Sequence, residues 1–275
     1  MRINVDYRTH YQYGAPAKSI IQILRLTPRP HEGQRVARWQ VDMDADAKLI
    51  RSEDALGNII HTAFVNGPVS ELEVAVSGEV ETWDTHGVVR EAVERFSPEV
   101  FLRHTDLTLA DPDLLAFARD IAGEAPNDPL DLLHRLMMAI HQEVAFDTAP
   151  TQTTTTAAQA FALKRGVCQD LSHVFIAAAR ALGAPARYVS GHLARDDGDI
   201  LQQASHAWAE AHVPDLGWVG FDPVNAVCPT PAYVRVAIGL DYLGASPVRG
   251  SRQGGGQEQM TVKLVVSHAQ RQTQS

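Results

Sequence analysis

Three residues in the second half of the 275-residue chain have the types and spacing of a nucleophilic site. Cys168 stands in the stretch RGVCQDLSHVFIAAARALGAPARYV, between a glycine and apolar residues at helical spacing. A thiol attacks as its thiolate, which the unpaired N–H groups and dipole of a helix N-terminus stabilise. Those N–H groups, that of Cys168 included, could also donate to the oxyanion of a tetrahedral intermediate. Position alone leaves Cys168 open between a nucleophile and a small core residue, since free cysteines are often buried.

A cysteine nucleophile needs a base and a group that orients the base. The chain has 12 histidines, and His206 begins the strand-like run HAWAEAHV directly after a polar loop. Asp222 ends the next run, GWVGFD, which the turn PDLG joins to the first. The sequence therefore indicates Cys168 as nucleophile, His206 as general base and acid, and Asp222 as the orienting carboxylate.

The hairpin between these two runs makes this assignment testable. A two-residue turn pairs Val213 with Trp218 and puts Asp222 on the face opposite His206. A longer loop pairs His212 with Trp218 and puts the two site residues diagonal on one face. We expect the longer loop, or a bulge.

The other histidines and the second cysteine have weaker claims to a chemical role. His192 ends a strand near the polar loop and could line the cleft, whereas Cys228 has no helix behind it and is expected to be structural. Glu210 is expected to face solvent or an arginine, and Asp170 to satisfy N–H groups in the first turn of the cysteine helix. Surface or structural roles are assigned to His10, His31, His61, His86 and His104.

The elements that must position the site fall into two regions. From Arg2 to about Trp83, short alternating runs are separated by Gly, Pro, Asn and Asp, which predicts an antiparallel sheet, most simply a β-sandwich. We place this all-β sandwich-like domain at residues 1–88. A second domain, residues 89–275, is expected to contain the site and the C-terminal strand MTVKLVVS.

In the second region the spacing of apolar residues changes from the two-residue period of strands to the period of helices. Helices are predicted from Asp111 to Gly123, from Asp128 onward, over residues 157–163, and from about Cys168 to Gly183, with aspartate N-caps before proline in the first two. Alternating strands then return, which indicates an α+β fold with a largely antiparallel sheet. The loop RGSRQGGGQEQ follows no strand-to-helix pattern and is expected to be a flexible connection.

The composition of the chain limits which binding partners and which cellular compartment we expect for the protein. A formal net charge of −9 gives no electrostatic footprint for nucleic acid or an anionic membrane surface. The N-terminus lacks signal-peptide features, no apolar run reaches membrane-spanning length, and two cysteines fit a reducing compartment. We expect a cytoplasmic protein with a peptide or other amide-bearing substrate, without cofactor or metal. Its oligomeric state stays open.

The site segments resemble a known family. RGVCQDLSH, ARYVSGHL and SHAWAEAHVPDLGWVGFDPVN are similar to the core of bacterial transglutaminase-like proteins, which include proposed cysteine proteases. The leading all-β region and the stretches VAIGLDYLGASPVRG and GGGQEQMTVKLVV are similar to that family too. The resemblance implies a papain-like α+β core with Cys168, His206 and Asp222 as its triad. It also implies acyl transfer from an amide through a cysteine thioester.

The sequence leaves three functions open. Water as acceptor gives hydrolysis of a peptide, isopeptide or related amide bond, and an amine gives a protein-glutamine transglutaminase. A non-enzymatic binding module on the same fold is the third. No tryptophan lies between Trp83 and Trp208, where animal transglutaminases place the indole that holds the oxyanion, and no calcium-ligand cluster is evident. Both absences favour the hydrolase.

Overall fold

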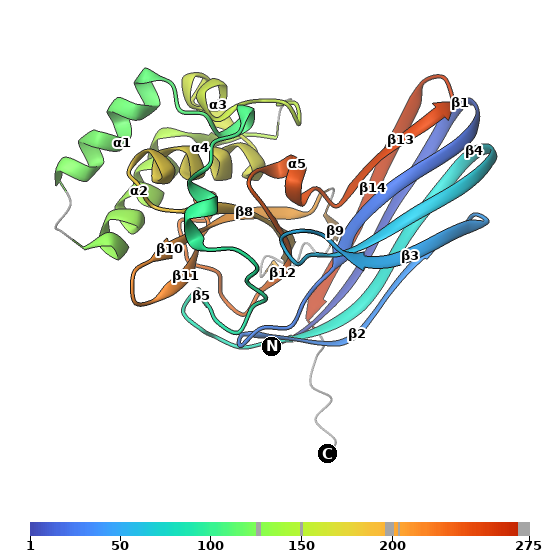
Figure 1. Cartoon of the computed structure of the whole chain (residues 1–275), viewed down its shortest axis with the longest axis horizontal. Helices are drawn as coiled ribbons and strands as arrows, with labels where there is room; N and C mark the ends of the chain where they lie inside the picture. The colour runs from blue at the N-terminus through green and yellow to red at the C-terminus, as the bar shows by residue number, and fades with distance from the viewer. Residues whose placement is uncertain (125–127, 149–150, 196–200, 203, 269–275) are drawn as a thin grey trace, which may run out of the picture.

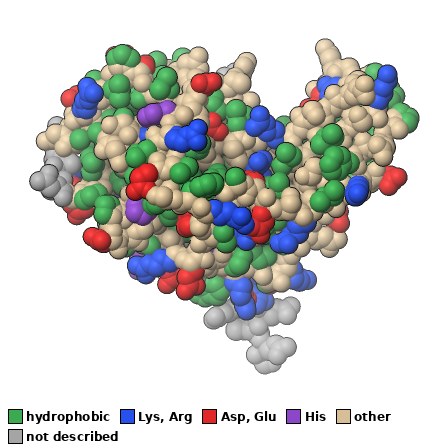
Figure 2. Space-filling view, in the orientation of Figure 1, with side chains coloured by type: hydrophobic (Ala, Val, Ile, Leu, Met, Phe, Trp, Pro, Cys, Tyr) green, Lys and Arg blue, Asp and Glu red, His purple; other side chains and the backbone are tan. Residues whose placement is uncertain are grey.

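The computed structural model of the chain has two parts that lie side by side (Figure 1). It describes residues 1–124, 128–148, 151–195, 201–202 and 204–268. One part is all-β and the other packs helices on a sheet, which confirms the predicted α+β core behind an all-β region. Figure 2 shows a notch in the surface between the second part and the far end of the first.

The all-β part is a sheet that folds over on itself into two layers (Figure 1). β1 and β4 pair antiparallel along their whole length, and both bend near their middles. Gly67 lies where the register between β1 and β4 is irregular, and a Cβ there would come within 2.0 Å of the Ala17 carbonyl oxygen, so the close approach requires glycine. The strands from the N-terminal segment are β1 (Arg2–Thr27), β2 (Gln34–Met43), β3 (Ala47–Glu53) and β4 (Ile59–Thr82).

Two C-terminal strands complete this sheet. β13 (Val248–Gly254) and β14 (Glu258–His268) pair with the two halves of β1, and β9 (Leu201–Gln202) pairs with β14. The expectation that the C-terminal strand belongs with the site region is therefore wrong. The segment expected to be a connection before that strand itself contributes residues 249–254 to β13. Alternation shows that a segment is a strand but not which sheet it joins, and the glycines at 254–256 adopt positive φ at the bend between the strands.

The α+β part holds a five-stranded antiparallel sheet in the order β12-β8-β10-β11-β5. Its strands are β5 (Val88–Val89), β8 (Ala186–Leu193), β10 (His206–Val213), β11 (Gly217–Phe221) and β12 (Tyr233–Gly239), and the two-stranded β6 (Ala145–Phe146) and β7 (Arg165–Gly166) stand apart. The helices are α1 (Pro112–Glu124), α2 (Pro129–Glu143), α3 (Ala157–Leu163), α4 (Cys168–Ala181) and α5 (Tyr242–Ala245), with 3-10 turns at Pro98–Leu102 and Asp106–Thr108. None of the described helices is both long and apolar enough to cross a membrane.

Local sequence signals explain where the helices begin. The Asp111 carboxylate accepts from Leu114 N at 2.9 Å, and the Asp128 carboxylate accepts from Leu130 N at 2.8 Å, so both predicted N-caps are confirmed. The predicted end of α1 at Gly123 is one residue short, because the helix continues to Glu124. These caps fix the two helices that pack with α4.

The two parts are joined along the edge strand β12. Two amide side chains of the all-β part each imitate a neighbouring strand. Gln34 accepts from the N–H of Arg235 and donates to its carbonyl, both at 2.8 Å. Asn58 does the same with Ile238, also at 2.8 Å. These bonds satisfy backbone groups that an edge strand would otherwise leave unpaired.

Candidate active site

Cys168 occupies the first turn of α4 and is partly exposed. The Asp170 carboxylate accepts from the N–H of Val167 at 2.8 Å, as its predicted capping role requires. Gly166 leaves room for this cap, since a Cβ there would lie 2.6 Å from the Asp170 Cβ. The chain therefore turns tightly into α4. This turn places Cys168 at the helix N-terminus, where the dipole favours an anion.

Helix α4 is held against the sheet by small and aromatic side chains. Ala209 of β10 is fully buried, and Phe175 of α4 stacks on Phe221 of β11 with ring centroids 5.2 Å apart. His173 on the same helix accepts from the Tyr242 N–H at 3.0 Å, and burial lowers its pKa to about 4. His173 is therefore a neutral structural residue that anchors α5.

The hairpin that carries the other two residues has the longer loop. His212 pairs with Trp218, and Val213 pairs with Gly217, whose φ of 91° closes the turn. This register confirms the prediction and puts His206 and Asp222 on one face. Their Nε2 and Oδ2 atoms are 2.6 Å apart.

The electrostatics of His206 reflect two partners. Burial lowers its pKa, but the hydrogen bonds and charges of Asp222 and Cys168 together outweigh burial and raise the pKa to about 10. Since Nε2 is engaged by Asp222, Nδ1 is the ring nitrogen left for Cys168.

Asp222 is held by five donors. Its Oδ1 accepts from the N–H groups of Val224 (2.9 Å) and Asn225 (3.3 Å). Its Oδ2 accepts from His206, from Asn225 Nδ2 (2.7 Å) and from the Tyr233 hydroxyl (2.7 Å). Burial raises the pKa of Asp222, but these bonds, led by that of His206, bring it below its usual value, so the carboxylate stays ionised.

Sequence reasoning missed Asn225 and Tyr233. The segment DPVN carries a recognisable signal, because an aspartate that accepts from N–H groups two and three residues on forms an Asx-type turn. Nothing local to Tyr233 signals its role, since it reaches Asp222 from β12, the far edge of the sheet.

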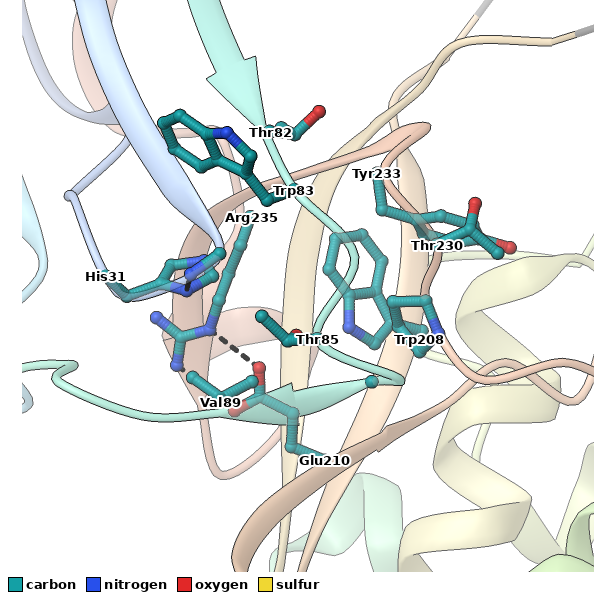
Figure 3. Close-up of a pocket in the computed structure, with 13 residues that line it drawn as sticks. His31, Thr82, Trp83, Thr85, Val89, Trp208, Glu210, Thr230, Tyr233 and Arg235 are labelled. Carbon is teal, nitrogen blue, oxygen red and sulfur yellow. Dashed lines mark hydrogen bonds and ion pairs between the residues drawn. The ribbon is translucent and has the colours of Figure 1, made fainter. Parts of the chain in front are cut away.

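Two aromatic rings form a wall behind the imidazole. Trp208 stacks near-parallel to His206 with centroids 6.2 Å apart, and Tyr233 lies edge-on to Trp208 at 5.4 Å. Figure 3 shows Trp208 and Tyr233 on one side of a small pocket of about 40 Å³, with Glu210 and Arg235 on another. These ring contacts restrict rotation of the His206 imidazole.

The sequence left Glu210 open between facing solvent and facing an arginine. In the structure it faces two arginines. It is fully buried, and its carboxylate lies 2.7 Å from Arg187 Nε and 2.6 Å from Arg235 Nε. Arg187 also binds Glu94, with Nη1 and Nη2 at 2.8 and 2.9 Å from its carboxylate oxygens. The cluster connects β8, β10 and β12 to the segment before the first helix.

Two other candidates are structural in this arrangement. His192 does not line a cleft: it is buried against Tyr7 and Trp39 of the all-β part, and burial lowers its pKa to about 4. Cys168 and Cys228 are both free, and burial raises the pKa of Cys228 to about 11, which makes it a poor nucleophile. Within the described ranges, no group of three or more His, Cys, Asp or Glu side chains is placed to hold a metal ion.

Family models match both parts of the chain. A model of the transglutaminase-like superfamily matches residues 116–223, which include all three site residues, and a model of the bacterial transglutaminase-like N-terminal region matches residues 3–81. An uncharacterized protein of Mycobacterium bovis is 30% identical over 90% of this chain and 87% of its own length. The chain belongs to the transglutaminase-like superfamily.

Further relatives cover the whole chain or part of it. An uncharacterized protein of Mycobacterium leprae is 28% identical over 97% of this chain and 98% of its own length. The protein-glutamine gamma-glutamyltransferase of Pseudomonas aeruginosa is 28% identical over 50% of this chain and 23% of its own length. The structure of a proposed cysteine protease from Cytophaga hutchinsonii has a TM-score of 0.77 at 20% identity, covering 98% of this chain and 92% of that one, and so shares the fold.

Proposed function

We propose that this transglutaminase-like protein is a cysteine-dependent amide hydrolase that cleaves a peptide, isopeptide or related amide bond. One observation carries the proposal: His206 is bonded to a buried, ionised Asp222 through Nε2 and is also hydrogen-bonded to the Cys168 side chain. Such an arrangement supplies a nucleophile and a proton carrier in one place.

The reaction would proceed in two acyl transfers. The Cys168 thiolate attacks the amide carbonyl carbon and forms a C–S bond, while N–H groups at the α4 N-terminus stabilise the oxyanion. The His206 imidazolium gives its proton to the leaving nitrogen as the C–N bond breaks. The neutral ring then takes a proton from water, whose oxygen attacks the thioester carbon and releases a carboxylic acid and the sulfur. Asp222 keeps the ring oriented through both steps.

An amine could replace water in the second step, as the name of the Pseudomonas aeruginosa relative suggests. A glutamine peptide and a labelled amine distinguish the two reactions. Both reactions release one ammonia for each glutamine that acylates the cysteine. Hydrolysis predicts ammonia release with little amine incorporation, and incorporation of nearly one amine for each ammonia released would instead assign a transglutaminase.

The test of the nucleophile is a panel of peptide and amide substrates incubated with wild type, Cys168→Ala and Cys228→Ala. We expect Cys168→Ala to lose activity by three or more orders of magnitude, while Cys228→Ala, the matched control, retains it. Amide cleavage that survives in Cys168→Ala would refute the proposal. Saturable peptide binding without turnover by wild type would point to a binding module.

A further inference from the structure

The two donors that share Asp222 Oδ2 with His206 form a closed triangle with it. Asn225 Nδ2 lies 2.7 Å from Asp222 Oδ2 and 3.3 Å from the Tyr233 oxygen, and the Tyr233 hydroxyl lies 2.7 Å from the same Oδ2. Because an amide nitrogen can only donate, the Tyr233 oxygen accepts from Asn225, and its own proton is directed at Asp222.

This triangle affects the His206 base through Asp222 Oδ2, the atom that accepts the hydrogen bond of the ring. Oδ2 accepts three hydrogen bonds, one of them from the His206 ring. Each donor draws electron density from the carboxylate, so each one weakens the hold of Oδ2 on the imidazolium. The triangle also fixes the position of Oδ2, since Tyr233 is only 8% exposed and its ring packs edge-on against both Trp208 and His206.

We propose that Tyr233 is a positioning residue that, together with Asn225, holds Asp222 Oδ2 in place and limits how tightly it binds the proton on His206. The inference deepens the proposed function and rests on it. A base that must release its proton in one step and take one up in the next gains from a carboxylate that orients the ring without holding its proton too firmly. The effect of the tyrosine passes through Asp222, whose Oδ2 accepts both its hydroxyl proton and the His206 bond.

The test uses the full-length protein and does not require the substrate. Iodoacetate is an anion, and it alkylates a thiolate fastest while the neighbouring imidazolium is charged. The rate at Cys168 should therefore fall as pH rises through the pKa of His206. Mass spectrometry of the tryptic peptide spanning residues 166–180 measures that rate separately from any reaction at Cys228.

We expect Tyr233→Phe to keep the ring packing and to move the descending limb of the alkylation profile upward by about half to one pH unit. Turnover near neutral pH should fall by about threefold to tenfold, since less of the base is free to accept a proton. Asn225→Ala should shift the limb in the same direction. Because Asn225 is exposed, this variant also provides the test if Tyr233→Phe folds poorly. Tyr13→Phe is the matched control, because Tyr13 is equally buried but lies in the all-β part.

The outcomes separate this inference from the proposed function. A limb that stays in place or moves to lower pH in folded Tyr233→Phe and Asn225→Ala would overturn the positioning role. A purely structural tyrosine would lower stability and leave the limb unmoved. An upward shift in a protein that cleaves no amide would support the positioning role and refute the hydrolase.

Discussion

Replacing Glu210 by glutamine should destabilise the protein more than any surface charge change. The pKa of Glu210 lies at about 2, against 4.5 for an ordinary glutamate, because Arg235 and Arg187 outweigh the raising effect of burial. A depression of that size corresponds to about 3 kcal/mol of folding free energy at neutral pH. Arg187 keeps Glu94 as a partner in Glu210→Gln, but Arg235 loses the carboxylate to which it makes two hydrogen bonds, while its side chain remains only 12% exposed. We therefore expect a loss of about 3–5 kcal/mol.

Urea unfolding followed by tryptophan fluorescence measures this loss. The pH dependence gives a second check, because a depressed carboxyl pKa contributes stability that is present above the unfolded pKa and is lost as pH falls through the folded one. Wild type should lose stability between pH 4.5 and about 2, and Glu210→Gln should lack that component. Asp131→Asn is the control, since its pair with Arg135 is largely solvated and should contribute under about 1 kcal/mol. A Glu210→Gln protein within 1 kcal/mol of wild type, with an unchanged acid slope, would refute the reasoning.

Three further changes have expected outcomes. Gly166→Ala should cost about 1–3 kcal/mol in thermal denaturation and slow Cys168 alkylation, since the new methyl meets the Asp170 cap; unchanged values would show that the helix entry tolerates a side chain. Asp222→Asn removes the charge that raises the pKa of His206, so the descending limb of the iodoacetate profile should move to lower pH, and a limb that stays near pH 10 would contradict the Asp222 contribution. Deleting residues 2–82 takes away the partner of β13 and β14, so circular dichroism and gel filtration should find a poorly folded, associating protein rather than a compact 89–275 unit.

The parts of the site that could be predicted are those whose signals lie within a few consecutive residues. The helix start at Cys168 follows from glycine, a capping aspartate and an apolar stripe within a few residues. The hairpin offered two registers, and requiring His206 and Asp222 on one face selected the one observed. Chemistry thus resolved a choice that strand propensity leaves open.

Long-range partners could not be predicted in the same way. Glu210 meets arginines 23 residues earlier and 25 residues later, and Tyr233 reaches Asp222 across a turn and from another strand. A strand pattern gives the face of each residue but not the order of strands in a sheet. The same gap explains the misplaced C-terminal strand MTVKLVVS, whose two-residue period fits either sheet.

The all-β part influences the candidate site through β12. Gln34 fixes the backbone at Arg235, whose side chain binds Glu210, and Tyr233, two residues earlier on the same face, binds Asp222. A shift of the all-β part would therefore act on the backbone that carries both the ion cluster and the orienting hydrogen bond. Gln34 supplies β12 with the donor and the acceptor that a neighbouring strand would supply. These paired bonds resist sliding of the all-β part along the direction of β12. The all-β part thus serves as the missing strand on the open edge of the sheet, and that role keeps the tyrosine hydroxyl in register with the carboxylate.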